Sequence, residues 1–169
     1  MGKRSRRRRH RSGKVEASLD DAPSTFTRFR ITDSGRVLRE ALTDSSCEFP
    51  RHNGAYEGLA HRYSYYNTRR RLRSFYDSIT KLDLSDFTET TYTADGAGNS
   101  FCEPVFTPRP GATAEDDGWL LTVEYQAREH TSRLVILDAR DVAAGPIATA
   151  RLRHHVPQGF HGSYTPANR

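Results

Sequence analysis

The sequence is poor in the residues that mark several common classes of protein. Its 169 residues include only two cysteines, one methionine and one tryptophan. No Cys-x-x-Cys pair is present to begin a zinc site, and Cys47 and Cys102 are expected to be small buried residues rather than a disulfide. No run approaches the ~20 apolar residues of a membrane-spanning helix, and the basic start lacks the apolar segment of a secretory signal. A cytoplasmic protein is therefore expected.

The chain also lacks a net positive charge once the first residues are set aside. Residues 1–14 carry eight Lys and Arg side chains and no acid, whereas the remaining 155 residues carry 18 basic and 21 acidic side chains. A run of like charges with few apolar residues does not bury enough surface to order itself, so residues 1–24 are predicted to be a disordered basic tail. Such a tail would bind nucleic acid by counterion release. The rest of the chain offers no matching basic face, so no specific nucleic-acid partner is expected.

Helical periodicity is nearly absent, apart from one turn expected within residues 138–144. Short segments rich in β-branched and aromatic residues alternate with clusters of Gly, Pro, Asn and Asp, which is typical of an all-β protein. Strands are predicted at residues 26–31, 36–42, 60–66, 75–84, 88–93, 104–107, 118–125, 133–138 and 147–153.

The strand pattern repeats along the chain. Phe29, Leu82 and Ile136 occupy the same place in successive units and are separated by 53 and 54 residues. A repeat near 50 residues built from short strands is the mark of a β-propeller, whose blades are small antiparallel sheets arranged around an axis. A closed propeller needs at least four blades, and this sequence holds strands for two and parts of a third. The fold is therefore expected to be incomplete.

Two acids and a histidine share a second repeated position. Glu48, Glu103 and His161 are separated by 55 and 58 residues. Equivalent residues of successive blades converge on the propeller axis, so these three side chains are candidates for a common site. A lone glutamate at the start of a strand is more often a solvated strand end, and it is the repetition together with His161 that makes both acids candidates.

The other histidines are weaker candidates for a functional site. His61 lies in an alternating strand, where packing or surface exposure accounts for it. His154 and His155 are neighbours and would face opposite sides of a strand. The remaining three lie in the tail or in loops: His10, His52 and His130.

Four segments of the chain resemble one family in the same order. They are residues 47–51, 103–119, 134–141 and 156–162. Together they resemble the C-terminal third of the carotenoid cleavage oxygenases, a group that includes stilbene-cleaving enzymes and the retinoid isomerase of the eye. The resemblance runs from about residue 25 to residue 164, and the long second segment makes it specific.

The resemblance implies a fold and a metal site. Members of the family are seven-bladed β-propellers that hold one ferrous ion, Fe(2+), with four histidines from four blades and with glutamates hydrogen-bonded to the ligand imidazoles. By motif position His161 resembles the fourth iron ligand, and Glu48 and Glu103 resemble two of these glutamates. A carboxylate that accepts the N–H of one ring nitrogen fixes the tautomer and directs the other nitrogen to the metal. No catalytic residue beyond the metal site is predicted.

The resemblance also implies a reaction and its partners. The family includes iron(II)-dependent dioxygenases that use dioxygen to cleave a conjugated carbon–carbon double bond in a carotenoid, apocarotenoid or stilbene-like substrate. The substrate reaches the metal through an apolar tunnel, and contact with a membrane surface would suit a lipid substrate.

The resemblance covers only part of the family's fold. Residues 25–169 are therefore predicted to form part of a seven-bladed β-propeller, with about two to three blades. The family's other three ligand histidines precede this region, and one histidine does not hold a catalytic iron, so the isolated chain is expected to lack activity. Two alternatives remain open: a catalytically inactive propeller remnant or interaction module, and a nucleic-acid binder that acts through its basic tail.

Overall fold

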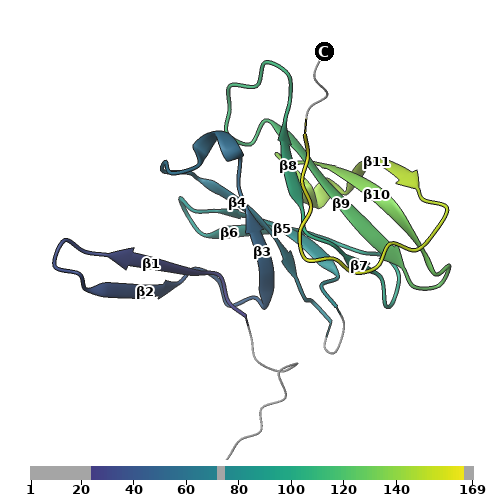
Figure 1. The fold of residues 1–169 in the computed structure, drawn as a ribbon, viewed down its shortest axis with the longest axis horizontal. Helices are drawn as coiled ribbons and strands as arrows, with labels where there is room; N and C mark the ends of the chain where they lie inside the picture. Colours follow the sequence, from purple (N-terminus) through teal and green to yellow (C-terminus); the bar gives the residue numbers. More distant parts are fainter. Residues whose placement is uncertain (1–23, 72–74, 166–169) are drawn as a thin grey trace, which may run out of the picture.

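The computed structural model describes residues 24–71 and 75–165, and this part of the chain is built from short strands (Figure 1). The strands are β1 (Thr27–Ile31), β2 (Val37–Ala41), β3 (Cys47–Arg51), β4 (Tyr63–Thr68), β5 (Ser78–Asp83), β6 (Thr88–Thr93), β7 (Ser100–Phe101), β8 (Val105–Pro108), β9 (Gly118–Gln126), β10 (Thr131–Asp138) and β11 (Pro146–Arg151). Two short 3₁₀ turns, η2 (Gly54–Tyr56) and η3 (Val142–Ala144), lie between strands. The all-β prediction is confirmed. The predicted basic tail lies outside the described residues, except for Ser24.

The strands form three antiparallel sheets. The hairpin sheet consists of β1 and β2, the middle sheet has the order β3-β4-β5-β6, and the C-terminal sheet has the order β11-β10-β9-β7, with β8 also paired to β9. Figure 1 shows the middle sheet beside the C-terminal sheet, while the hairpin sheet extends away from both. No helix in the described residues is long and apolar enough to cross a lipid bilayer.

The sequence repeat corresponds to a repeated hairpin. Phe29 lies on β1, Leu82 on β5 and Ile136 on β10. Each of these strands pairs with the next one along the chain, to give the hairpins β1-β2, β5-β6 and β10-β11. The residues that the spacing relates therefore each lie on the first strand of a hairpin.

The main core lies between the middle and C-terminal sheets. Tyr65, Ile79, Leu120, Val135 and Leu137 are fully buried there. Burial of a large apolar side chain contributes roughly 1.5–3 kcal/mol, so this contact between sheets is a principal source of stability. A smaller cluster packs the segment after β2 against the other face of the middle sheet, and its buried members are Leu42, Cys47, Tyr66 and Leu82.

A buried lysine reinforces the contact between the two larger sheets. The Nζ atom of Lys81 lies 2.7 Å from a carboxylate oxygen of Asp116 and donates to the carbonyl of Arg140 at 3.2 Å. The same atom lies 4.1 Å from the centre of the Tyr63 ring. Partners from several segments thus compensate the removal of this charge from water.

All nine predicted strands overlap observed strands, with bounds that differ by up to three residues, and η3 lies within the predicted turn at residues 138–144. Two further strands, β3 and β7, were not predicted. A proline argues against a strand because it cannot donate to the ladder, and β3 contains Pro50. Since β3 is at the edge of its sheet, the missing N–H is tolerated there.

Candidate functional site

Glu103 lies in the connection between β7 and β8, two strands that pair with different parts of β9. Hydrogen bonds to β9 fix this connection: the Cys102 amide donates to the carbonyl of Val123 at 2.8 Å, and the Thr122 hydroxyl donates to the carbonyl of Cys102 at 2.6 Å. The Glu103 side chain is only 4% exposed. A carboxylate so buried requires hydrogen-bond donors from neighbouring segments.

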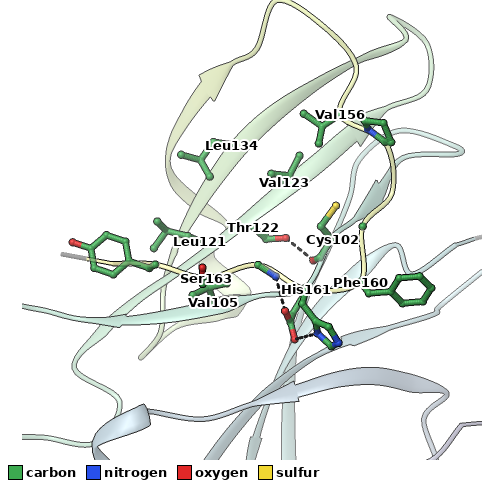
Figure 2. A pocket seen from close by; sticks show the side chains of 15 residues that line it. Cys102, Val105, Leu121, Thr122, Val123, Leu134, Val156, Phe160, His161 and Ser163 are labelled. Atoms are coloured by element: carbon green, nitrogen blue, oxygen red, sulfur yellow. Dashed lines mark hydrogen bonds and ion pairs between the residues drawn. The ribbon is translucent and has the colours of Figure 1, made fainter. Parts of the chain in front are cut away.

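The Glu103 carboxylate receives donors from two distant segments. Arg51 of β3 donates from Nε to Oε1 at 2.7 Å and from Nη2 to Oε2 at 2.9 Å. The amide of Gly162 donates to Oε2 at 2.9 Å, and Nδ1 of His161 lies 3.4 Å from Oε1 (Figure 2). The acid and the histidine of the repeated position are therefore in contact.

These contacts favour the ionised carboxylate. Burial opposes ionisation of Glu103, but the hydrogen bonds from Arg51, Gly162 and His161 outweigh it and hold the pKa of Glu103 below its usual value. The same pairing raises the pKa of Arg51. As a negatively charged carboxylate, Glu103 can accept a hydrogen bond from the neutral imidazole of His161 and so orient its ring.

A β-bulge in β3 directs Arg51 toward Glu103. Glu48 pairs with Asn67 but Arg51 pairs with Tyr65, so β3 contains one more residue than β4 over this interval. Phe49, inside the bulge, has φ of 56°, in the left-handed region that residues other than glycine rarely adopt. Such strain persists where the surrounding structure holds it, often at functional sites.

The bulge also places an aromatic ring beside the histidine. The Phe49 and His161 ring centres are 5.8 Å apart at an interplanar angle of 81°, and the Phe49 and Phe160 centres are 6.4 Å apart at 76°. These are edge-to-face arrangements, which are favourable for aromatic pairs. Phe49 and Glu103 thus contact the His161 ring from two different segments.

The outer side of the His161 ring is open. Its side chain is 73% exposed, and within the described residues its Nε2 atom has no hydrogen-bond partner. When Nδ1–H donates to Glu103, the lone pair of Nε2 is available to a metal. This arrangement fits one metal-ligand position.

The segment that carries His161, residues 152–165, crosses the face of the C-terminal sheet. The amide of Val156 donates to the Ser132 hydroxyl at 3.0 Å, and the Gln158 side chain donates to the Ser100 hydroxyl at 2.7 Å. Between this segment and the sheet lies a cavity of ≈ 270 Å³ beside His161 (Figure 2). Its apolar wall is formed by Val105, Leu121, Val123, Leu134 and Val156.

Glu48, the third residue of the repeated position, lies in a different environment. It is half-buried on β3, and its carboxylate contacts Tyr76. Burial raises the pKa of Tyr76, a hydrogen bond with Ser24 lowers it, and the interaction with Glu48 raises it further. The contacts of Glu48 in the described part of the chain include no histidine, so its predicted hydrogen bond to a ligand imidazole stays a prediction.

Sequence reasoning missed Arg51. The one indication in the sequence was that Arg51 follows Glu48 by three residues, within the same short motif. Two pairs of the remaining histidines stack: the His52 and His61 ring centres are 4.6 Å apart, and the His130 and His155 centres 4.9 Å apart. Yet the described residues contain no group of three or more His, Cys, Asp or Glu that could hold a metal ion. They fit a single ligand position and do not complete a metal site.

Known proteins share both the sequence and this fold. An apocarotenoid-15,15'-oxygenase of Synechocystis sp. is 41% identical over 146 residues, which is 84% of this chain and 29% of the relative. Carotenoid 9,10(9',10')-cleavage dioxygenase 1 of Arabidopsis thaliana is 29% identical over 167 residues, covering 90% of this chain and 30% of the relative. A crystal structure of cobalt-substituted Synechocystis apocarotenoid oxygenase superimposes with a TM-score of 0.82 at 37% identity, covering 90% of this chain and 32% of that one.

The match extends along nearly the whole chain, although the chain spans less than a third of each of these relatives. The family described as retinal pigment epithelial membrane protein matches residues 2–166. The chain therefore belongs to this family, that of the carotenoid oxygenases.

Proposed function

We propose that this chain forms part of a seven-bladed β-propeller oxygenase and contributes His161 as one ligand of a ferrous ion. The contact between the buried Glu103 carboxylate and Nδ1 of His161 carries the proposal. It is the arrangement by which a carboxylate orients a metal-binding imidazole. The repeated hairpins support the propeller, and the cobalt-substituted relative supports a metal site.

The residues around His161 would prepare it for the metal. Glu103 accepts the Nδ1 proton and so directs Nε2 outward, while Arg51 and Gly162 hold Glu103 in place. Phe49 limits rotation of the ring. When bound, Fe(2+) supplies the binding and activation of dioxygen.

The proposed reaction is the oxidative cleavage by dioxygen of a conjugated carbon–carbon double bond in a carotenoid, apocarotenoid or stilbene-like substrate. The names of the relatives, which include an apocarotenoid oxygenase and a carotenoid cleavage dioxygenase, support this class of substrate. The apolar cavity beside His161 is consistent with an apolar substrate. A lipid substrate of this kind would bring a cytoplasmic enzyme to a membrane surface.

The described residues supply one ligand position, so the activity is proposed only for an assembly that includes the other ligands. This observation also favours a second candidate function. In that alternative the chain is a propeller remnant or interaction module that keeps the fold without the metal.

A chimaera with the Synechocystis relative tests the iron-ligand proposal. Residues 25–165 would replace the matching segment of that oxygenase, and iron content and cleavage of an apocarotenoid would be measured. We expect bound iron and cleavage products, with both lost in His161→Ala. Phe160→Ala is the control, because its side chain is exposed and packs beside the site without a role as ligand. Iron retained at full occupancy in His161→Ala would refute the proposal.

The purified chain separates the two candidate functions. Incubated with Fe(2+) and then desalted, it is expected to retain far less than one iron per chain, since one imidazole does not hold the ion. An inactive chimaera that nevertheless folds would favour the remnant or interaction module.

A further inference from the structure

Within the part of the chain that the structure describes, Gln158 is the one polar anchor of the stretch that leads to His161. No backbone group of residues 157–161 forms a hydrogen bond with the described residues. Among the side chains of residues 157–160, only that of Gln158 forms hydrogen bonds there. The position of His161 on the sheet therefore depends on Gln158 before it and on Gly162 after it.

The Gln158 amide binds the same connection that carries Glu103. Its Nε2 atom donates to the hydroxyl of Ser100 at 2.7 Å, and its Oε1 atom lies 3.8 Å from Sγ of Cys102, whose thiol can donate to it. Glu103 follows Cys102 directly in the chain. Gln158 thus attaches the histidine segment to the residues immediately before the carboxylate that His161 contacts.

The partner of Gln158 is buried, which makes its bond selective for one position. Ser100 is 1% exposed, and among the described residues its hydroxyl has no hydrogen-bond partner other than Gln158. A buried hydroxyl that loses its partner destabilises the fold. Gln158 itself is exposed, so the hydrogen bond, and not burial of the side chain, fixes this part of the segment.

The contact between His161 and Glu103 is sensitive to small displacements. Nδ1 of His161 lies 3.4 Å from Oε1 of Glu103, whereas the amide of Gly162 donates to Oε2 of the same carboxylate at 2.9 Å (Figure 2). A further separation of about 0.2 Å would leave no hydrogen bond to the ring. The segment could therefore stay attached through Gly162 while His161 loses the acceptor that orients it.

We propose that Gln158 is a positioning residue, which through Ser100 holds His161 close enough to Glu103 for Nδ1–H to bond to the carboxylate. Nε2 then remains unprotonated and free. The inference rests on the proposed role of His161 as a metal ligand and says how that ligand is prepared before a metal binds. If Gln158 served only to attach the segment to the sheet, its loss would lower stability and leave the His161 ring unchanged.

The protonated nitrogen of His161 can be observed directly in the full chain. With histidine labelled by ¹⁵N, in the presence of a chelator and at about pH 8, where imidazole is mostly neutral, the ring nitrogen shifts show which atom carries the proton. The loss of signals in His161→Asn assigns them. In the natural chain Nδ1–H should predominate. In Gln158→Met, which keeps the length of the side chain without its amide, the Nδ1–H share should fall at least about twofold.

Three further variants separate positioning from stability. Ser100→Ala removes the other partner of the hydrogen bond and should shift the His161 proton in the same direction. The double variant with Gln158→Met should shift it no further than the larger single change, because both remove one bond. Val142→Ala is the control: Val142 is buried in the main core, so its truncation lowers stability through a cavity and should leave the proton of His161 on Nδ1.

A natural distribution of the His161 proton in Gln158→Met would overturn the proposal, whatever the variant loses in stability. Additive shifts in the double variant, or an equal shift in Val142→Ala, would overturn it as well. If Gln158→Met does not fold, Ser100→Ala compared with Val142→Ala decides. The chimaera with His161→Ala tests the ligand role separately, so His161 can prove to be a ligand even where Gln158 proves not to position it.

Discussion

Arg51 and Glu103 form a two-point ion pair that joins the middle sheet to the C-terminal sheet, with Nε–Oε1 and Nη2–Oε2 distances of 2.7 and 2.9 Å. The carboxylate that Arg51 binds also receives the amide of Gly162 and lies beside His161. The pair therefore does more than join two sheets. It also holds the Glu103 carboxylate in place beside His161.

Removal of the Arg51 guanidinium should destabilise the chain and release the segment around His161. In Arg51→Met the buried Glu103 carboxylate keeps the Gly162 donor but loses two others, at a cost of about 1–2 kcal/mol, because Arg51 is itself part exposed. Urea unfolding measures the cost, and Arg51→Lys, which restores one donor, should recover part of it. An unchanged unfolding midpoint in Arg51→Met would contradict this account.

The left-handed backbone of Phe49 gives a second prediction. In an ordinary strand glycine is less stable than alanine by about 0.5–1 kcal/mol, but at a φ of 56° the order should reverse. Phe49→Gly should therefore be more stable than Phe49→Ala by about 1 kcal/mol. Both variants lose the ring, so the difference isolates the backbone. Greater stability of Phe49→Ala in thermal or urea unfolding would rule out the strained conformation.

The repeated hairpins were predictable from sequence because an apolar position recurs on the first strand of each hairpin. Phe29, Leu82 and Ile136 each lie on the first strand of a hairpin, as their spacing indicates. A second spacing, of 55 and 58 residues, led to Glu48, Glu103 and His161, of which the structure brings the last two into contact. Local alternation suffices for the hairpins, since each is formed by residues close together in sequence, whereas the contact of Glu103 with His161 was accessible only through the repetition.

Features that depend on a bulge or on long-range pairing were not predictable. The bulge in β3 shifts the strand by one residue and directs Arg51 to a carboxylate 52 residues away. A prediction from strict alternation assumes that successive side chains point to opposite faces, and a bulge breaks that rule. Pro50 also argued against a strand at residues 47–51, where β3 lies. Neither the proximity of Arg51 to Glu103 nor the contact of Glu48 with Tyr76 follows from local pattern.

The two cysteines should differ strongly in reactivity. Both are free thiols. Burial raises the pKa of Cys47 to about 11, a backbone hydrogen bond at Phe26 lowers it, and the nearby charges of Glu89 and Glu48 add to the rise. A raised thiol pKa means less thiolate, on the order of one molecule in ten thousand at pH 7, whereas Cys102 is only half-buried and borders the cavity.

Alkylation of the native chain followed by mass spectrometry measures this difference. Cys102 should be modified well before Cys47 at pH 8, and Cys102→Ser should leave the native protein nearly unreactive until denaturant is added. Cys47→Ser is the matched control and should retain the fast phase. Equal rates at the two thiols in the native state would contradict the burial of Cys47.

Acid should weaken the fold partly through Asp138. Burial opposes ionisation of this carboxyl, but hydrogen bonds from the Arg140 amide and the Arg109 guanidinium, each at 2.9 Å, outweigh it and lower the pKa of Asp138. A carboxyl whose pKa is lower in the folded state stabilises the fold above its ordinary pKa, and this contribution is lost as the pH falls toward the folded value.

The lowered pKa of Asp138 predicts how the stability of Asp138→Asn depends on pH. The variant should be less stable than the natural chain at pH 7, and the difference should shrink by pH 3, below the ordinary pKa of the carboxyl, because the unfolded natural chain binds the proton there more readily than the folded chain does. Urea unfolding at the two pH values measures both differences. Asp33→Asn is the control, because Asp33 is an exposed residue of the β1-β2 turn and should change stability little at either pH. If the loss in Asp138→Asn were the same at pH 3 as at pH 7, the carboxylate would contribute through its shape and hydrogen bonds and not through its charge.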